Sequence, residues 1–272
     1  MASELTKIEE ALRKLQAQSG DSSEVSTAVS TDTRPATRRG SADIGRMTTP
    51  ETWSPAQLEK RGLLDFFGPE RQAANAFRQL RTSLVHRAAE SNFVLAVTGV
   101  RQGSGTSFVA RNLAAAFALD PTKTSVLVDC ELGDRTNSRM TPGSGGVRGL
   151  TDYLRHEEMR VDQLIQPTGV SRLRVIPAGT LTQGAGELYT SPRMQELLGQ
   201  LRGRYPDRFT ILDVPPVIDN ADGRILSELC DYTLLVVPYA GASEARVGRA
   251  MDIVGADRLI GTVVNNDPGG QS

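Results

Sequence analysis

A glycine-rich segment with the sequence TGVRQGSGTS spans residues 98–107, between an apolar run typical of a buried strand and an apolar helical pattern. Such a turn directs several backbone N–H groups and the positive end of the helix dipole at one point, which suits a phosphate group. The usual phosphate loop ends Gly-Lys-Ser/Thr, and here Gly105 and Ser107 match while Thr106 stands in the lysine position. Since tight turns also use glycine for steric reasons alone, the loop by itself is a weak signal.

Two more apolar runs end in an acidic residue. The sequence VLVDCE places Asp129 and Glu131 after one run, and ILDVPP places Asp213 after another. Carboxyl ends of parallel strands face the same crevice, where carboxylates can hold hydrated Mg²⁺ or orient an attacking water or hydroxyl. One strand-terminal Asp is more often a helix cap or turn former. Two of them in order after a glycine loop favour a nucleotide site.

The elements that would position these groups alternate along the chain. Apolar runs rich in Val, Ile and Leu predict strands at Phe93–Thr98, Ser125–Asp129, Leu173–Pro177, Phe209–Asp213, Thr233–Pro238 and Ile260–Asn265. Helical patterns predict helices at Ala73–His86, Phe108–Leu119, Thr151–Leu154, Met194–Arg204 and Ala245–Val254. Strand alternating with helix predicts an α/β fold: a doubly wound, mainly parallel sheet with helices on both faces, as in P-loop NTPases.

The chain also divides by composition. Residues 1–18 carry an amphipathic helical pattern, and 19–71 are predicted to be a flexible linker because their first half is almost empty of large apolar residues. The N-terminal segment is therefore expected to be disordered. Residues 72–268 carry the α/β patterns and 269–272 form a tail. The glycine-rich stretch Thr141–Gly149 is expected to be a flexible loop and not a second phosphate site, because no buried strand precedes it.

The composition argues against several classes of protein. A net charge of -1, from 31 basic and 32 acidic residues, argues against a nucleic-acid partner. Cys130 and Cys230 suggest neither a disulfide framework nor a metal site. There is no apolar run long enough to span a membrane and no apolar core of a signal peptide, so we expect a cytoplasmic protein.

From Phe77 to about Pro268, seven stretches match one family in order. They are AFRQLRT (76–82), the phosphate loop, LVD (127–129), VIPAG (175–179), GELYTSPRM (186–194), ILDVPPV (211–217) and LIGTVVN (259–265). On these stretches the chain resembles the cytoplasmic kinase domain of bacterial tyrosine autokinases of capsule and exopolysaccharide assembly. That family belongs to the deviant-Walker ATPases, which include the Par and Min partition proteins. The segment 8–14 more weakly resembles the leader of autokinases linked to exosortase systems.

The resemblance implies a site for ATP or ADP with Mg²⁺. The nucleotide-binding positions that it implies are Arg101, Gln102, Gly103, Ser104, Gly105, Thr106, Ser107 and Asn265. Ser107, Asp129 and Asp213 would hold the metal, and Asp129, Glu131 and Asp213 would act in catalysis if the protein is active. Asn265 and Asn266 lie where related ATPases read the adenine, although Asn is also common at strand ends, and without a metal Ser107 would simply cap its helix.

Several positions depart from the family. Thr106 replaces the lysine, Asp129-Cys130-Glu131-Leu132-Gly133 replaces Asp-x-Asp-x-Arg, and the chain ends without a tyrosine-rich tail. The helix that mediates ring assembly in the family carries Asn75 in place of glutamate before Arg78 and Arg81, so a ring is doubtful, although self-association through this helix stays an alternative. Arg101 lies where partition ATPases carry a second lysine, and it is either a substitute cation or an exposed loop arginine.

These departures favour a regulatory role. We expect a component of exopolysaccharide or capsule biosynthesis or export that docks on a polysaccharide chain-length-determinant inner-membrane protein, peripheral to the membrane, with weak or absent kinase activity. One alternative is an active ATPase or protein-tyrosine kinase that uses Arg101 in place of the lysine. The other is a positioning ATPase like ParA and MinD, since one fold hosts many functions.

Overall fold

The computed structural model describes residues 51–69, 71–89, 92–131, 140, 147–180, 185–204, 207–239 and 241–266. All of them fall in the unit of the chain that spans Arg39–Ser272. The predicted helix in 1–18, the linker as far as residue 50 and the tail 269–272 lie outside the described residues, as does most of the glycine-rich stretch from Thr141.

One mainly parallel sheet organises the described residues, in the strand order β3-β4-β2-β5-β1-β6-β7. Its strands are β1 (Val94–Gly99), β2 (Thr124–Asp129), β3 (Gln166–Pro167), β4 (Leu173–Ile176), β5 (Arg208–Asp213), β6 (Tyr232–Pro238) and β7 (Leu259–Asn265). All neighbouring pairs are parallel except β3 with β4. The chain runs from β1 to one side of the sheet and returns to the other side at β6, so β1 lies at the point where the strand order reverses and ligands of such sheets bind.

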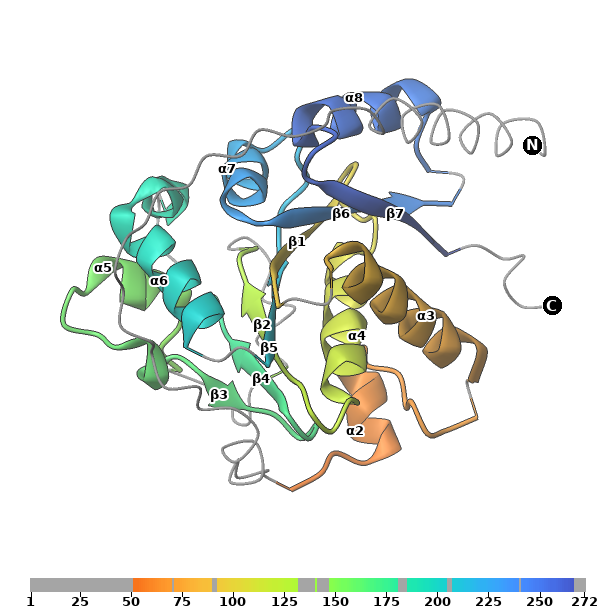
Figure 1. Cartoon of the computed structure of the whole chain (residues 1–272), viewed down its shortest axis with the longest axis horizontal. Helices are drawn as coiled ribbons and strands as arrows, with labels where there is room; N and C mark the ends of the chain where they lie inside the picture. The colour runs from red at the N-terminus through yellow and green to blue at the C-terminus, as the bar shows by residue number, and fades with distance from the viewer. Residues whose placement is uncertain are drawn as a thin grey trace. The chain divides into compact units, whose positions relative to one another are not determined.

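Helices cover both faces of this sheet (Figure 1). The α-helices are α2 (Pro55–Lys60), α3 (Arg71–Arg87), α4 (Thr106–Ala118), α5 (Leu150–Arg155), α6 (Pro192–Gly203), α7 (Ala221–Leu229) and α8 (Glu244–Val254), with 3-10 turns η3 (Val161–Gln163) and η4 (Ala185–Thr190). Helices α3 and α4 lie on one face, and α5, α6, α7 and α8 lie on the other. The predicted doubly wound α/β class is confirmed.

Alternate side chains of the central strand explain this arrangement. Leu95 and Val97 of β1 pack with α3 and α4, whereas Val94 and Ala96 pack in the cluster under α5, α6 and α7. All of β1 is buried, so the strand is apolar on both faces, as the continuous apolar run predicts. A third cluster joins α8 to β6 and includes Val100, the residue directly after β1.

The segment 51–69, hereafter the strap, differs from the predicted linker. Leu63 and Phe66 are buried in the same core as α3 and α4. The backbone N–H of Trp53 donates to the carbonyl of Gly169, 3.1 Å away, and helix α2 begins with a capping box between Ser54 and Gln57. The ordered domain therefore begins before residue 72, because the strap supplies apolar side chains that cover α4.

Within the described part of the chain, no helix is long and apolar enough to cross a membrane.

Candidate functional site

The phosphate loop joins β1 to α4 as the sequence predicts. Gly103 and Gly105 adopt φ values of 78° and 83°, in the left-handed region that favours glycine, and Gly105 is the N-cap of α4. The first-turn N–H groups of α4 have no partner within the helix, and the helix dipole adds positive charge there. The loop therefore keeps the backbone of an anion site.

Thr106 occupies the position of the missing lysine at the first residue of α4. Its side chain is 8% exposed and faces back toward β1. A Cβ on Gly99 would lie 2.7 Å from the Thr106 hydroxyl oxygen and 2.8 Å from Cβ of Ser104. The threonine is therefore packed beneath the loop, and it brings no positive charge to the lysine position.

Ser107 is partly exposed at the second residue of α4. The N-cap is Gly105, so the interpretation of Ser107 as the helix cap is wrong: the helix begins two residues earlier than a cap at Ser107 would require. The main-chain carbonyl of Ser107 accepts a hydrogen bond from Nε of Arg111, 2.8 Å away. Ser107 thus lies in the first turn of α4, directly after the loop.

The predicted acids lie beside this loop. Asp129 and Asp213 are directly opposite each other at the carboxyl ends of the parallel strands β2 and β5, and both are buried. Glu131 lies two residues beyond Asp129, and its backbone N–H donates to Oδ1 of Asp129, 3.2 Å away. Gln102 on the phosphate loop donates from Nε2 to Oε1 of Glu131, 3.0 Å away. The loop after β2 is thereby joined to the phosphate loop.

The acids and Ser107 could hold Mg²⁺ only together with ligands from a bound nucleotide. The described residues contain no group of three or more His, Cys, Asp or Glu side chains that could hold a metal. Mg²⁺ usually binds one or two carboxylates together with substrate phosphates and several waters. Asp129, Asp213 and the hydroxyl of Ser107 are of this kind, so the residues present fit a metal that arrives with a nucleotide.

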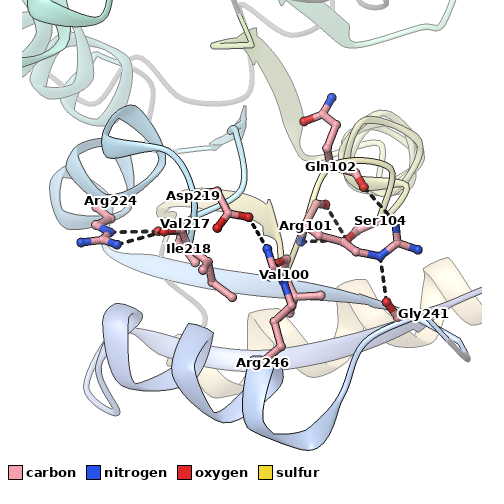
Figure 2. A network of polar contacts seen from close by, with 10 residues as sticks. All are labelled: Val100, Arg101, Gln102, Ser104, Val217, Ile218, Asp219, Arg224, Gly241 and Arg246. Atoms are coloured by element: carbon pink, nitrogen blue, oxygen red, sulfur yellow. Dashed lines mark hydrogen bonds and ion pairs between the residues drawn. The ribbon is translucent and has the colours of Figure 1, made fainter.

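Arg101 is exposed, but its guanidinium is bonded to main-chain carbonyls (Figure 2). Nε donates to the carbonyl of Gly241 at 2.8 Å, and Nη1 donates to the carbonyl of Gln102 at 3.2 Å. Gly241 follows β6, so the arginine joins the phosphate loop to the next loop of the sheet edge. Two nitrogens of the guanidinium, Nε and Nη1, are thus bonded to the protein itself.

Asn265 is at the end of β7 and touches the same loop. Its Nδ2 donates to the carbonyl of Ser104, 3.1 Å away, and a Cβ on Gly105 would collide with it. Asn266 next to it has φ of 61°, in the left-handed region that Asn tolerates. In this structure the amide of Asn265 stabilises the loop, whatever it adds to nucleotide recognition.

Arg78 and Arg81, the predicted self-association residues, are partly buried and contact their own chain. Arg78 donates to the carbonyl of Phe66 at 2.5 Å and to Oδ1 of Asn75 at 2.9 Å. Arg81 donates to the carbonyl of Ala116 at 3.1 Å, near the carboxyl end of α4. These contacts hold the strap and α3 against α4.

Two further arginines lie near the site, and the sequence does not predict their contacts (Figure 2). Arg246 on α8 donates from Nε to the carbonyl of Val100, 2.9 Å away, and pairs with Asp219 in the loop after β5. Arg224 on α7 donates to the carbonyls of Val217 and Ile218, each 3.0 Å away. An arginine on an amphipathic helix gives no sequence signal of a carbonyl partner, so only the fold reveals them.

Burial raises the pKa of three titratable side chains in this part of the chain. The pKa of the Cys130 thiol is raised well above its usual range, chiefly by burial and then by the charge of Asp129. The Tyr189 hydroxyl donates to the Cys130 carbonyl at 2.8 Å, and burial likewise raises the pKa of Tyr189. Partial burial also raises the pKa of Asp222 in the first turn of α7. Cys130 is thus a packed, protonated thiol and not a nucleophile.

No family model matches the chain. It is similar to the tyrosine-protein kinase Wzc of Salmonella typhi, with 32% identity over 179 residues, which are 65% of this chain and 24% of that protein. It is also similar to the tyrosine-protein kinase CpsD of Streptococcus agalactiae, with 27% identity over 191 residues, covering 70% of this chain and 80% of CpsD. The matched part of the chain thus spans about a quarter of the length of Wzc but most of CpsD.

Solved structures agree with these relatives. The kinase domain of the Escherichia coli tyrosine kinase ETK superposes with a TM-score of 0.65 at 25% identity, covering 79% of this chain and 88% of that domain. A ParA family ATPase from Chlorobium tepidum superposes with a TM-score of 0.51 at 19% identity, covering 64% of this chain and 72% of the other, and this likeness concerns the fold alone. Homologues of the chain are bacterial tyrosine-protein kinases, and the fold is that of P-loop ATPases.

Proposed function

We propose that this homologue of bacterial tyrosine-protein kinases is a component of exopolysaccharide or capsule assembly that regulates or docks on a chain-length-determinant membrane protein. Its kinase activity is weak or absent. The general role is inferred from the relatives, which are the tyrosine-protein kinases Wzc and CpsD and the putative tyrosine-protein kinase EpsB. The departure from kinase activity rests on one position of this chain, Thr106.

Thr106 is the observation that carries the proposal. A lysine in that position is a point charge for the β- and γ-phosphates. Losing one charge-assisted hydrogen bond costs about 1.5–3 kcal/mol of binding, or roughly one to two decades in affinity. The cost is at least as large in a transition state whose phosphoryl oxygens gain charge. Threonine is neutral and short, and here its side chain is packed beneath the loop.

The rest of the site supports a retained binding role. Gly103 and Gly105 of the loop have the left-handed conformation, and Asp129 and Asp213 lie directly opposite each other at the ends of β2 and β5. ATP or ADP with Mg²⁺ is the ligand of this class that the loop backbone, Ser107 and the two acids would hold. Bound Mg²⁺ would neutralise phosphate charge. The chain's own residues would orient the phosphates and bury them against α4, so nucleotide would stabilise a docking surface without being consumed.

The alternative is an active ATPase or protein kinase in which Arg101 replaces the lysine. The exposure of Arg101 on the phosphate loop favours it, together with the retained acids. Against it stands the engagement of the guanidinium with the Gly241 carbonyl.

A turnover assay separates the two. Phosphate release and phosphotyrosine would be measured for the natural protein, for Asp213→Asn and for Thr106→Lys at saturating Mg-ATP. We expect the natural protein to match Asp213→Asn, because neither places a full catalytic set on the phosphates. Release well above Asp213→Asn, and lost on Arg101→Ala, would establish the active alternative.

Docking needs its own experiment. The natural protein would be used as bait on solubilised membranes of its own source, with recovered proteins identified by mass spectrometry. We expect a polysaccharide chain-length determinant in the eluate, and the same partner with Asp213→Asn, because docking does not require turnover. An eluate without such a partner would count against the docking role, whatever the turnover assay shows.

A further inference from the structure

Three loops at the carboxyl ends of β1, β5 and β6 are joined by arginine side chains (Figure 2). The most connected of these is Arg246. Its Nε donates to the carbonyl of Val100, the first residue of the phosphate loop, at 2.9 Å, while its Nη2 pairs with Asp219 of the loop after β5. One planar guanidinium therefore fixes two loops to α8 at the same time.

An apolar contact links the same three elements independently. Val100 is fully buried in a cluster with Val217 and Ile218 of the loop after β5 and with Val247 of α8, the residue next to Arg246. Apolar packing and hydrogen bonding thus restrain the start of the phosphate loop from the same side. Because the Arg246–Asp219 pair is partly exposed, with side-chain exposures of 35% and 64%, its charge alone contributes little. The bond from Nε to the loop carbonyl is the decisive contact.

Arg224 offers a comparison within the same network. It donates twice, to the carbonyls of Val217 and Ile218, and so restrains the loop after β5 from α7. Both of these contacts are with the loop after β5, whereas Arg246 contacts the phosphate loop directly. Both arginines contact the loop after β5, Arg224 through main-chain carbonyls and Arg246 through the Asp219 carboxylate, and Arg246 also contacts Val100.

We propose that Arg246 is a positioning residue for the phosphate loop: by bridging the Val100 carbonyl and Asp219, it holds the loop in its anion-binding shape without a bound nucleotide. The loop is thereby coupled to the outer surface of α8. Coupling of this kind is reciprocal, so a partner that moves α8 would change the loop, and a loop ligand would change α8. The inference goes beyond the proposed function and holds whether or not phosphate is transferred.

Amide hydrogen exchange in the nucleotide-free protein tests the bridge. Three loop amides have acceptors and serve as probes: Val100 donates to the Val236 carbonyl at 3.2 Å, Arg101 to the Ser104 hydroxyl oxygen at 3.3 Å, and Ser104 to the Arg101 carbonyl at 3.3 Å. The variants are Arg246→Ala, Arg246→Lys, Asp219→Asn and the matched control Arg224→Ala. Lysine keeps the charge near Asp219, but its single ammonium cannot reproduce the two-sided bridge.

We expect exchange at the three probes to be about ten-fold faster in Arg246→Ala and in Arg246→Lys, as for the loss of one hydrogen bond to a charged group. Exchange within β1 and β5 should stay unchanged, and Arg224→Ala should leave the probes at their natural rates. Unchanged probes in Arg246→Ala, equal acceleration in Arg224→Ala, or natural rates in Arg246→Lys would each overturn the proposal.

A milder variant covers the case in which Arg246→Ala does not fold. Asp219→Asn retains the size of the side chain and removes only the charge that fixes the far end of the guanidinium. Acceleration of about two- to three-fold at the same probes supports the bridge, because part of the anchoring is lost, and natural rates overturn it. Since no nucleotide is present, the outcome is separate from the turnover and docking assays that test the proposed function.

Discussion

The side-chain amide of Asn265 donates a hydrogen bond to the carbonyl of Ser104, 3.1 Å away, across 161 positions of the chain. The bond joins the end of β7 to the phosphate loop at the residue before Gly105. The same amide lies so close to Gly105 that a Cβ there would collide with it. The last strand and the phosphate loop therefore fit together only while position 105 has no side chain.

Gly105→Ala should accordingly disrupt both contacts. Gly105 has φ of 83°, and a residue with a Cβ in the left-handed region costs about 1–2 kcal/mol before any collision. With the displacement of Asn265, we expect a total loss of roughly 2–3 kcal/mol in the free energy of unfolding. Urea unfolding followed by circular dichroism measures it.

Gly199→Ala is the matched control. Gly199 lies in α6, and a Cβ there would meet no heavy atom within 4 Å. Alanine should stabilise the helix by about 0.5–1 kcal/mol, because glycine loses more backbone freedom on folding. A Gly105→Ala variant as stable as Gly199→Ala would show that the loop does not hold the described conformation.

Thr106→Lys should restore a charge to the loop. We expect magnesium-ATP to bind about 10- to 100-fold more tightly than to the natural protein, since one charge-assisted hydrogen bond to phosphate is gained. Isothermal titration calorimetry of both proteins measures the difference. Thr106→Gln adds length without charge and should not tighten binding. Equal affinities for Lys and Gln would mean that charge at this position is irrelevant to the site.

Arg101→Ala distinguishes the two interpretations of that arginine. Because the guanidinium donates to the carbonyls of Gly241 and Gln102, we expect its removal to change the dissociation constant of magnesium-ATP by less than about three-fold. Arg249→Ala, which removes an exposed arginine of α8, is the reference for a non-specific charge effect. A loss of ten-fold or more in Arg101→Ala alone would establish Arg101 as the substitute cation.

The sheet was predictable from the sequence because its strands are buried on both faces. The six parallel strands begin and end within one residue of their predicted bounds, since continuous apolar runs end sharply at polar residues. The two-residue β3 is too short to leave a pattern, and α7 follows Asp219 and Asn220, which indicate only a turn. Local sequence therefore predicted the parallel strands and five of the helices, and missed β3, α2 and α7.

The sequence of the strap carries a signal for the start of a helix. Ser54, Pro55 and Gln57 form a capping-box sequence with proline at the first helical position, which marks the start of α2. The low apolar content of the residues before it obscured this signal. The partners of Arg78, Arg101 and Arg246 were beyond prediction, because main-chain carbonyls from distant parts of the chain leave no trace in local composition.

Asn112 should be essential for docking of the strap. It is fully buried in α4, donates to the carbonyls of Gly62 and Phe108 at 2.9 Å each, and accepts from the N–H of Leu64 at 2.8 Å. Asn112→Ala leaves the buried groups of the strap without partners, which costs about 2–4 kcal/mol of unfolding free energy. Urea unfolding measures the loss.

Trp53 reports whether that loss is local. It is the chain's single tryptophan and packs against Gly169 with the Arg61 guanidinium 4.2 Å from its ring centre. In Asn112→Ala we expect its fluorescence to change at lower urea than circular dichroism, because the strap detaches before the sheet unfolds. Gln79→Ala, at an exposed position of α3, should leave the two transitions together. Coincident transitions in Asn112→Ala at natural stability would contradict the anchoring role.

The buried thiols and Tyr189 predict a loss of stability at alkaline pH. Burial raises the pKa of Cys130, Cys230 and Tyr189 in the folded protein. In the unfolded chain these groups lose protons near pH 8.5 for the thiols and near pH 10 for the phenol. Above those values the folded state binds more protons than the unfolded state, so the free energy of unfolding must fall as the pH rises.

Each such group contributes a slope of up to about 1.4 kcal/mol per pH unit above its unfolded pKa. Urea unfolding at pH 7, 8.5 and 9.5 should therefore show a small decline, below about 1 kcal/mol for the two thiols, over the first interval and a steeper decline over the second. Cys130→Ser with Cys230→Ser removes the thiols and should flatten the decline between pH 8.5 and 9.5, leaving the phenol to act nearer pH 10. If the double variant declines as steeply as the natural protein, the thiols titrate in the folded state, and the tight packing of Cys130 beneath the acidic crevice is wrong.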